Sequence, residues 1–444
     1  MVEPRSATPS ARGRSVLMTG AAAALLAAAA LFALLRVTSL GSIGELRLGA
    51  GSPVMTDFKS TVYYPAKAYA DGINPYDAQQ YLTRYPAPEP LRLYPPATLL
   101  VFRPFAWLPL DTAMAVQACL TLLLSGVLAY VSLRLARLPT SAAAVLLVWG
   151  LILLSRPGQW NLLQGQMTLL IVLGVYAAFA AGRISPVVAG IGLALSLLKP
   201  NFGLPTAALM LARGHYRGAA IGIALTAVLN LVTVASLATQ SGGLFEFGRL
   251  FLGTGDQLRF GARLGTELNV FRVDGVGFIT RLLGVRLGVV ASLLAAALFL
   301  GLVAALLRRR QDPLASDRQP DSAVAGLLCC GVLIGMYHIG YDLLLLTWPC
   351  LALVKDLRGS PHVLPARRWV QAGLLGLLAF NYVTTFAVLG ALHAEGALFW
   401  IVASLNGAAL TALFALYLWD VLAARPSMAA GAVPLAATSQ RRCA

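Results

Sequence analysis

The stretch Ser15–Leu35, SVLMTGAAAALLAAAALFALL, contains no charged residue and lies between Arg14 and Arg36. Because a membrane-spanning helix needs about 20 apolar residues, this stretch predicts a helix that crosses a bilayer. A cleaved signal peptide is the alternative interpretation, but the apolar run is long for one and no convincing cleavage site follows it. We therefore expect this helix to be retained.

Further apolar segments follow along the chain. Its 444 residues are 58% hydrophobic and 12% charged, and the mean hydropathy is +0.75, which lies outside the range of soluble domains. We expect an all-α polytopic integral membrane protein with about 10–13 transmembrane helices, several of them short enough to be broken around a buried site. The expected spans are 15–35, 112–133, 140–154, 167–182, 186–198, 202–212, 218–239, 287–307, 322–339, 342–354, 369–390 and 396–420.

The net charge of +16 could indicate a nucleic-acid partner, but the basic residues lie at the ends of the apolar runs and form no single stripe. We expect no nucleic-acid binding and interpret these residues as topology determinants. The pattern is self-consistent with a cytoplasmic tail at 1–14, a membrane body at 15–422, a cytoplasmic tail at 423–444, and outer loops at 37–111 and 240–286. The predicted location is the plasma membrane, with multiple passes.

The cysteines show no metal-ligand spacing, so we expect small core residues. They are Cys119, Cys329, Cys330, Cys350 and Cys443.

The segment Met55–Asp77, MTDFKSTVYYPAKAYADGINPYD, follows the first span. It predicts a helix with Thr56 as N-cap, stopped by Gly72 and then Asn74–Pro75. An apolar face opposite a basic and aromatic face is typical of a helix that lies along a membrane surface. The proline-rich stretch Leu93–Leu110 is expected to be interfacial and to lead into the second span. The residues on the apolar face are Phe58, Val62, Ala66 and Tyr69.

Asp57 is the first candidate for chemistry. An acid in the first turn of a helix stabilises the helix dipole, which is the simplest interpretation. A carboxylate at a membrane boundary could also accept a proton from a hydroxyl group. Asp71 and Asp77 stand beside turn residues and are expected to hold the loop.

Polar residues at the predicted outer ends of other segments are further candidates. A lysine that interrupts an apolar run, such as Lys199, either snorkels or meets an anion. His338 and Asp342 are four residues apart and share a face if a helix continues through Gly340. This pair is either functional or a satisfied hydrogen-bonded pair of the structure. For the loop segments Gly72–Asp77 and Leu93–Pro96, the alternative to substrate binding is that these residues only form turns. The other candidates for substrate binding are Tyr63, Lys67, Asn74, Tyr94, Gln166 and Tyr341.

Five motifs between about residue 50 and residue 355 together resemble glycosyltransferase family 87, which is also catalogued as DUF2029. In order they are DFKSTVYYPAKAYADGINPYD, LYPP, QGQ, LKP and YHIGYDLLLL. The resemblance implies a GT-C-type bundle with interfacial helices at the outer face. It also implies transfer of mannose first, or arabinofuranose second, from a polyprenyl-phosphate donor to an extracytoplasmic glycolipid or polysaccharide, with membrane lipid as a further partner.

By this resemblance Asp57 corresponds to the catalytic residue, and Lys199 and His338 correspond to the family lysine and histidine. The sequence departs from the family pattern at Thr168, where relatives often carry asparagine. We expect Asp57 to act as the base and Lys199 and His338 to stabilise the departing phosphate, joined by Arg259 or Arg263.

We expect no nucleotide-sugar site because no acidic cluster or DxD pair is present, and we expect no cofactor and assign no metal ligand. Two other functions remain open at this point. A transporter or flippase of lipid-linked sugars fits twelve spans, although no internal repeat supports it. A non-catalytic envelope scaffold would tolerate changes at Asp57 or His338.

Overall fold

The computed structural model describes residues 11–42, 54–91, 94–182, 184–260, 269–284, 289–309, 321–359, 366–392 and 396–423. Within these ranges the chain is helical and forms no strand, apart from one antiparallel bridge between Arg272 and Ile339. The prediction of an all-α polytopic membrane protein is confirmed. Each expected span coincides with one helix or with consecutive helical pieces.

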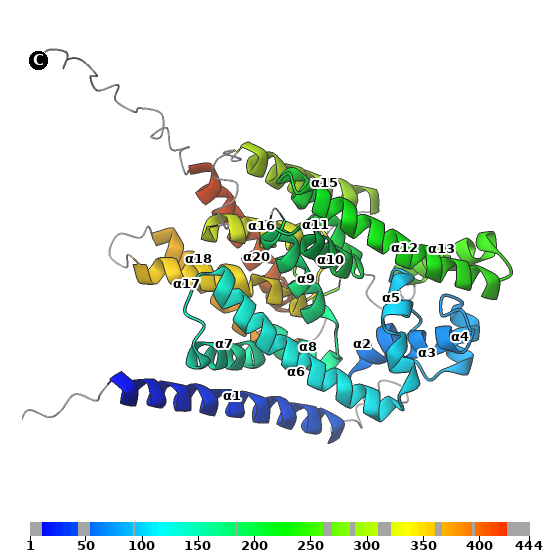
Figure 1. The fold of residues 1–444 in the computed structure, drawn as a ribbon, viewed down its shortest axis with the longest axis horizontal. Coiled ribbons are helices and arrows are strands. Elements are labelled where there is room, and N and C mark those ends of the chain that lie inside the picture. The colour runs from blue at the N-terminus through cyan, green and yellow to red at the C-terminus, as the bar shows by residue number, and fades with distance from the viewer. Residues whose placement is uncertain are drawn as a thin grey trace, which may run out of the picture.

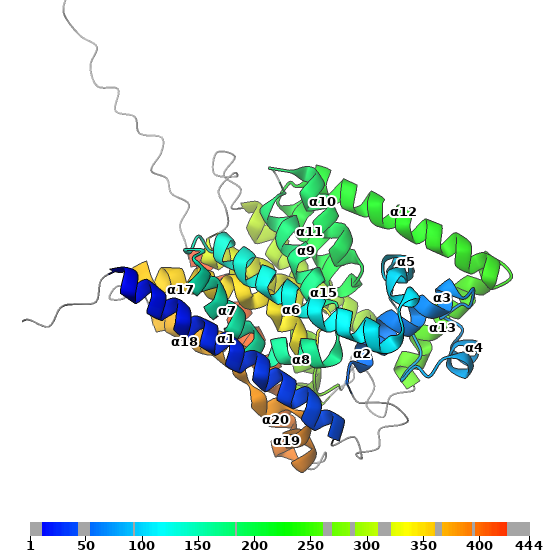
Figure 2. The same ribbon diagram turned by 60° about the horizontal axis from the view of Figure 1, so that its bottom comes forward.

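The long helices are α1 (Ala11–Ser42), α6 (Leu110–Leu135), α12 (Tyr216–Gln240), α15 (Val289–Arg309) and α20 (Ala397–Ala423). Four of them, α6, α12, α15 and α20, are long and apolar enough to cross a bilayer within the described residues. α1 packs along α7 at the edge of the bundle (Figure 2). The shorter core helices are α7 (Ala142–Leu154), α8 (Arg156–Gln164), α9 (Thr168–Ala180), α10 (Pro186–Leu197), α11 (Pro200–Ala212), α16 (Ser322–Ile334), η4 (Gly340–Leu346), α17 (Thr347–Gly359) and α18 (Ala366–Phe380).

The α7–α8 pair is one apolar run bent by 70°. The bend occurs at Ser155, whose hydroxyl accepts a hydrogen bond from the backbone N–H of Gly158 at 3.1 Å and so caps α8. A Cβ at Gly158 would lie 1.9 Å from the carbonyl oxygen of Ile152, so the turn requires glycine. The residues between the expected spans 140–154 and 167–182 therefore include a buried helix.

The interior of the bundle is built around α16. Nearly all of its side chains are buried, which is typical of a helix enclosed by others. It contacts α11, α15, α17 and α20. Cys329 and Cys330 are fully buried there, as expected, but Cys119 is exposed on α6 and its assignment to the core is wrong.

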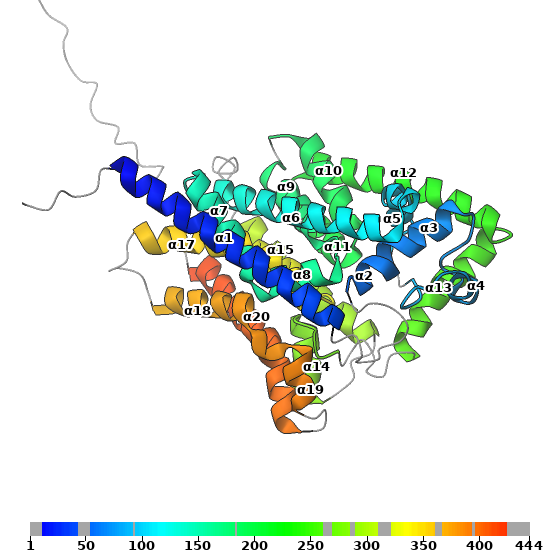
Figure 3. The same cartoon turned by 90° about the horizontal axis from the view of Figure 1, so that it is seen from below.

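Short helices replace the two long loops of the prediction. Figure 1 shows α2–α5 beside α13 at one end of the molecule, away from α17 and α18. Figure 3 shows α14 and α19 beside α20, at the edge opposite α10 and α12. The elements in the two loops are α2 (Thr56–Phe58), η1 (Lys59–Tyr63), α3 (Tyr64–Ala70), α4 (Ala78–Arg84), α5 (Ala97–Val101), η2 (Arg103–Trp107), α13 (Leu244–Phe260) and α14 (Gly275–Leu283). Outside these loops, η5 (Tyr382–Thr384) and α19 (Phe386–Ala391) follow α18.

Candidate active site

The helix that carries Asp57 is fastened at its start to the end of α8. Met55 adopts the left-handed conformation (φ 54°) and is the residue before the helix, so the prediction of Thr56 as N-cap is wrong. The backbone N–H of Met55 donates to the carbonyl of Leu163 at 2.7 Å. The hydroxyl of Thr56 donates to the side chain of Gln164 instead of capping its own helix.

The same helix continues through a π-helical turn, η1, into α3 and ends before Gly72 (φ 75°), as predicted. Its apolar face is buried, but Lys59 and Tyr63 on other faces are buried too, so protein encloses more of the helix than its pattern predicted. Burial lowers the pKa of the Lys59 amine, and the nearby Asp111 carboxylate opposes that shift. π-Helical turns are frequent at functional sites.

The Asp57 side chain is half-buried and reaches across to another element. Its Oδ2 accepts a hydrogen bond from Nε2 of Gln166 at 2.5 Å. A first-turn acid that acted only on the helix dipole would need no such partner. The dipole interpretation is therefore incomplete, because the carboxylate is also held in one orientation by a residue 109 positions away.

The connection from the last residue of α8 to the first residue of α9, residues 164–168, links Asp57 to the rest of the site, and we call it the bridging loop. Gly165 within it is left-handed (φ 64°) and fits closely against the Asp57 helix. The buried amide of Gln117, from α6, donates to the carbonyl oxygens of Gly165 at 3.0 Å and Gln166 at 3.4 Å. At the end of the loop, the Thr168 hydroxyl donates to Asp342 at 3.3 Å.

Asp342 is the centre of a fully buried charged cluster. Its Oδ1 lies 2.7 Å from Nζ of Lys199, and its Oδ2 lies 3.0 Å from Nδ1 of His338. Oδ2 also accepts a hydrogen bond from the backbone N–H of Ile339 at 3.2 Å. We call Lys199, His338 and Asp342 the buried triad.

Two breaks in helices make the triad possible. Lys199 stands between α10 and α11 and is only 8% exposed, so its interpretation as a snorkelling lysine is wrong. No helix continues through Gly340, since α16 ends at Ile334 and η4 starts at Gly340. The pairing of His338 with Asp342 is nevertheless confirmed, and the turn that η4 makes brings the two side chains together.

A second buried ion pair supports the backbone of His338, and the sequence analysis missed it. Arg272 contacts Asp274 through two hydrogen bonds of 2.9 and 2.7 Å. Oδ2 of Asp274 accepts from the backbone N–H of His338 at 3.3 Å, and the carbonyl of His338 accepts from Val273 N–H at 2.9 Å. The only signal in the sequence was that Arg272 and Asp274, of opposite charge, stand two residues apart.

The ring of Tyr341 packs against the triad. It lies 4.8 Å from Nζ of Lys199 and packs edge-on against Trp160 of α8 at 5.5 Å between ring centroids. Its hydroxyl is close enough to Asp57, Asp342 and Tyr94 to interact electrostatically with all three. The structure therefore brings together Asp57, Gln166, Lys199, His338, Tyr341 and Asp342, with Tyr94 nearby.

The remaining predicted substrate residues contact other partners. Tyr63 donates from its hydroxyl to the carbonyl of Leu108 at 2.9 Å. Asn74 donates from Nδ2 to the hydroxyl of Ser241 at 2.8 Å. Lys67 pairs with Asp71 at 3.0 Å on the surface. Contact of these three side chains with a substrate stays a prediction. Arg263 lies outside the described residues, as does the side chain of Arg259.

The other acids of the Asp57 segment hold the loop, as expected. Asp77 caps α4 by accepting a hydrogen bond from the backbone N–H of Gln80 at 3.1 Å. Asp71 accepts from Lys67 and from the Tyr85 hydroxyl at 2.8 Å. Burial acts to raise the pKa of Asp71, but these two hydrogen bonds together with the charges of Lys67 and Arg84 outweigh it and lower the pKa.

Comparison with known proteins assigns the chain to a family. A model of glycosyltransferase family 87 matches residues 93–336, more than half of the chain. This chain belongs to glycosyltransferase family 87. It is a membrane glycosyltransferase, which acts on a sugar donor and an acceptor. Neither the comparison with curated proteins nor that with solved structures returned a similar protein.

The matched residues of the family 87 model cover only one part of the site. Gln166, Thr168 and Lys199 lie within the match, whereas Asp57 and Asp342 lie outside it. The structure joins the two parts through side-chain contacts, since Gln166 binds Asp57 while Thr168 and Lys199 bind Asp342.

The bridging loop gives the first testable prediction. A Cβ at Gly165 would lie 2.7 Å from Cβ of Phe58, so Gly165→Ala must displace the loop or the Asp57 helix in addition to straining a left-handed backbone. We expect Gly165→Ala to lower transfer activity at least tenfold. A displacement of 1 Å in an active site can cost about 10²-fold, so a loss up to that order is expected. Transfer assays and thermal unfolding on the same preparations measure both effects.

Gly242 supplies a matched control for this substitution. It is also left-handed (φ 80°), but a Cβ there meets nothing within 4 Å. Gly242→Ala is therefore expected to cost only the backbone strain of about 1–2 kcal/mol and to keep its activity. Equal losses of activity in the two variants would contradict the role of the bridging loop.

Proposed function

We propose that this glycosyltransferase moves a sugar from a polyprenyl-phosphate donor to an extracytoplasmic glycolipid or polysaccharide, with Asp57 as the general base. The main support is that one five-residue loop contacts both Asp57 and Asp342. The proposed base thus stands at one end of this connection, and the Asp342 carboxylate that holds Lys199 and His338 stands at the other. Glycosyl transfer needs these two functions on the two sides of an anomeric carbon.

On the acceptor side, the Asp57 carboxylate removes a proton from the attacking hydroxyl. The hydroxyl oxygen then forms the new bond to the anomeric carbon. The amide of Gln166 holds the carboxylate by one oxygen at 2.5 Å, which fixes its direction without neutralising its charge. The start of a helix is a favourable place for the negative charge of this carboxylate.

On the donor side, the bond between the anomeric carbon and the phosphate oxygen breaks, and its electron pair leaves with the phosphate. The Lys199 ammonium carries three donors, one of which is directed to Asp342. Nε2 of His338 is buried and has no hydrogen-bond partner among the described residues. When the imidazole carries both protons, this nitrogen donates to a phosphate oxygen while Asp342 balances its charge.

Mannose is the first choice for the transferred sugar and arabinofuranose the second, because these are the sugars that the family resemblance implies. The test is purified protein in nanodiscs with each polyprenyl-phosphate sugar, radiolabelled, and a mixture of envelope glycolipid acceptors. Glycosidic product from either donor supports the proposal. Product from nucleotide-sugars alone, or movement of lipid-linked sugar across vesicles without product, would contradict it.

The proposed orientation places the site at the periplasmic or exterior face of the plasma membrane. Gln79 and Thr83 on α4 are exposed near the Asp57 helix, and Lys355 and Arg358 are exposed at the end of α17. In a variant without native cysteines, single cysteines at Gln79 or Thr83 should react with an impermeant maleimide in intact cells. Cysteines at Lys355 or Arg358 should react only after lysis, and the reverse pattern would refute the orientation.

A further inference from the structure

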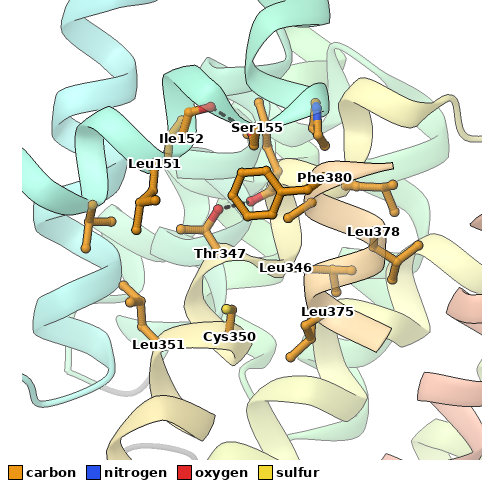
Figure 4. Close-up of a pocket in the computed structure, with 15 residues that line it drawn as sticks. Leu151, Ile152, Ser155, Leu346, Thr347, Cys350, Leu351, Leu375, Leu378 and Phe380 are labelled. Carbon is orange, nitrogen blue, oxygen red and sulfur yellow. Dashed lines mark hydrogen bonds between the residues drawn. The ribbon is translucent and has the colours of Figure 1, made fainter. Parts of the chain in front are cut away.

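An apolar cavity of about 140 Å³ lies among α7, η4, α17 and α18 (Figure 4). It is lined mainly by aliphatic side chains and by one aromatic ring, Phe380. Leu151 and Phe380, which come from different helices, are 41% and 47% exposed, so the cavity meets the lateral surface of the bundle between α7 and α18. The function proposed above makes no use of this cavity.

The two hydroxyl groups in the cavity wall already have partners. Ser155 donates to the carbonyl of Ile152 at 2.7 Å, and Thr347 donates to the carbonyl of Leu344 at 2.8 Å (Figure 4). A sugar or a phosphate in this space would lose its hydration and gain no hydrogen bond from these walls, which is unfavourable. Apolar cavities of about 150 Å³ stay dry and bind ligands the size of benzene. The wall chemistry therefore selects a hydrocarbon.

The cavity lies next to the buried triad. Leu343 and Leu344 line it and directly follow Asp342 in η4. Pro157 lines it from the first turn of α8, the helix whose Trp160 packs against Tyr341. The apolar cavity and the triad therefore share the short helix η4.

We propose that this cavity binds a segment of the prenyl chain of the donor, of about one five-carbon unit judging from the benzene-sized volume. The proposal rests on the proposed function, because the polyprenyl phosphate supplies the chain. The exposed mouth between α7 and α18 lets the rest of the chain remain in the bilayer. The cavity thereby selects the donor by its lipid and the triad holds its phosphate.

Cavity-filling variants test this site through the chain length of the donor. Ala379→Leu and Cys350→Leu each place additional carbons in the cavity from a different helix. Wild-type enzyme is expected to have a lower KM for a polyprenyl donor than for a donor that carries a methyl group in place of the prenyl chain. Each variant should raise KM for the long donor about tenfold or more, the effect of steric mismatch in an apolar pocket, and leave KM for the methyl donor nearly unchanged.

Gly376→Leu is the matched control, because a Cβ at this position of α18 meets nothing within 4 Å. It should keep the chain-length preference of the wild type. A variant that is merely misfolded would lose activity with both donors alike, which separates misfolding from a loss of chain recognition. Retention of the full preference for the long donor in both filling variants would overturn the proposal.

A binding experiment needs no turnover and so separates failure of this site from failure of the proposed function. A polyprenyl phosphate with a diazirine in its first isoprene units is irradiated with the protein in nanodiscs, and the labelled peptides are identified. We expect labels on α7, η4 or α18, suppressed by unlabelled polyprenyl phosphate and weakened by Ala379→Leu. The absence of a label on these helices would show that the cavity does not bind the chain. Labelling that diacyl phosphatidylglycerol suppresses equally well would show that bulk lipid fills the cavity. Either result would overturn the proposal.

Discussion

Asp57→Asn is expected to abolish sugar transfer. The amide keeps the size of the carboxylate but cannot accept a proton at neutral pH, and loss of a general base typically costs about 10²–10⁴-fold in rate. Because Gln166 donates to Oδ2, the asparagine can still accept that hydrogen bond through its own oxygen. The bridging loop should therefore keep its place, and thermal unfolding should change little. The decisive measurement is transfer from labelled polyprenyl-phosphate sugar by purified enzyme.

The helix-dipole interpretation predicts a different result for the same variant. It expects a loss of stability of about 0.3–1 kcal/mol and near-normal turnover. Asp71→Asn and Asp77→Asn are controls from the same segment, since both acids hold the loop through hydrogen bonds. Both controls should retain activity. A turnover of Asp57→Asn within about threefold of the wild type would show that Asp57 is not the general base, because loss of a base lowers the rate far more.

The positions of the helices could be predicted because burial in lipid leaves a local signature. Apolar runs of sufficient length appear directly in the sequence, and the spans expected at 112–133 and 218–239 correspond to α6 and α12 within a few residues. The α8 helix could not be found in this way. Its Arg156, Gln159 and Asn161 are polar, yet they are buried inside the bundle.

The candidate site was predicted as separate residues and not as an arrangement. His338 and Asp342 are close in sequence, so helical spacing was enough to suggest their contact. Lys199 and Asp342 are 143 positions apart, and Gln166 and Asp57 are 109 apart. Only the fold shows which distant groups meet. One chain without an alignment contains no record of such pairs.

Thr168 shows what a family pattern alone can miss. It stands where relatives often carry asparagine, which left the function of the turn undefined. The structure gives this threonine a hydrogen bond to Asp342, a contact that an asparagine amide could also make. Lys59 is the opposite case. Its burial depends on a π-helical turn, for which the sequence contains no comparable signal.

Asp342→Asn is expected to have the second large effect, and on both stability and donor binding. Lys199 and His338 each contact a different oxygen of this carboxylate, but an asparagine offers one oxygen and turns its N–H groups toward the other partner. Removing one member of a buried ion pair typically costs about 3–5 kcal/mol, because the remaining charge is uncompensated. Thermal unfolding in detergent should show this loss directly.

The double variant Lys199→Gln with Asp342→Asn separates folding from catalysis. It removes both charges, so much of the stability lost by Asp342→Asn alone should return. Transfer should stay low, because no ammonium remains to stabilise the departing phosphate, and KM for the donor should rise more than KM for the acceptor. A double variant that recovers activity together with stability would show that the buried triad only supports the fold, and the phosphate-binding role of Lys199 would be wrong.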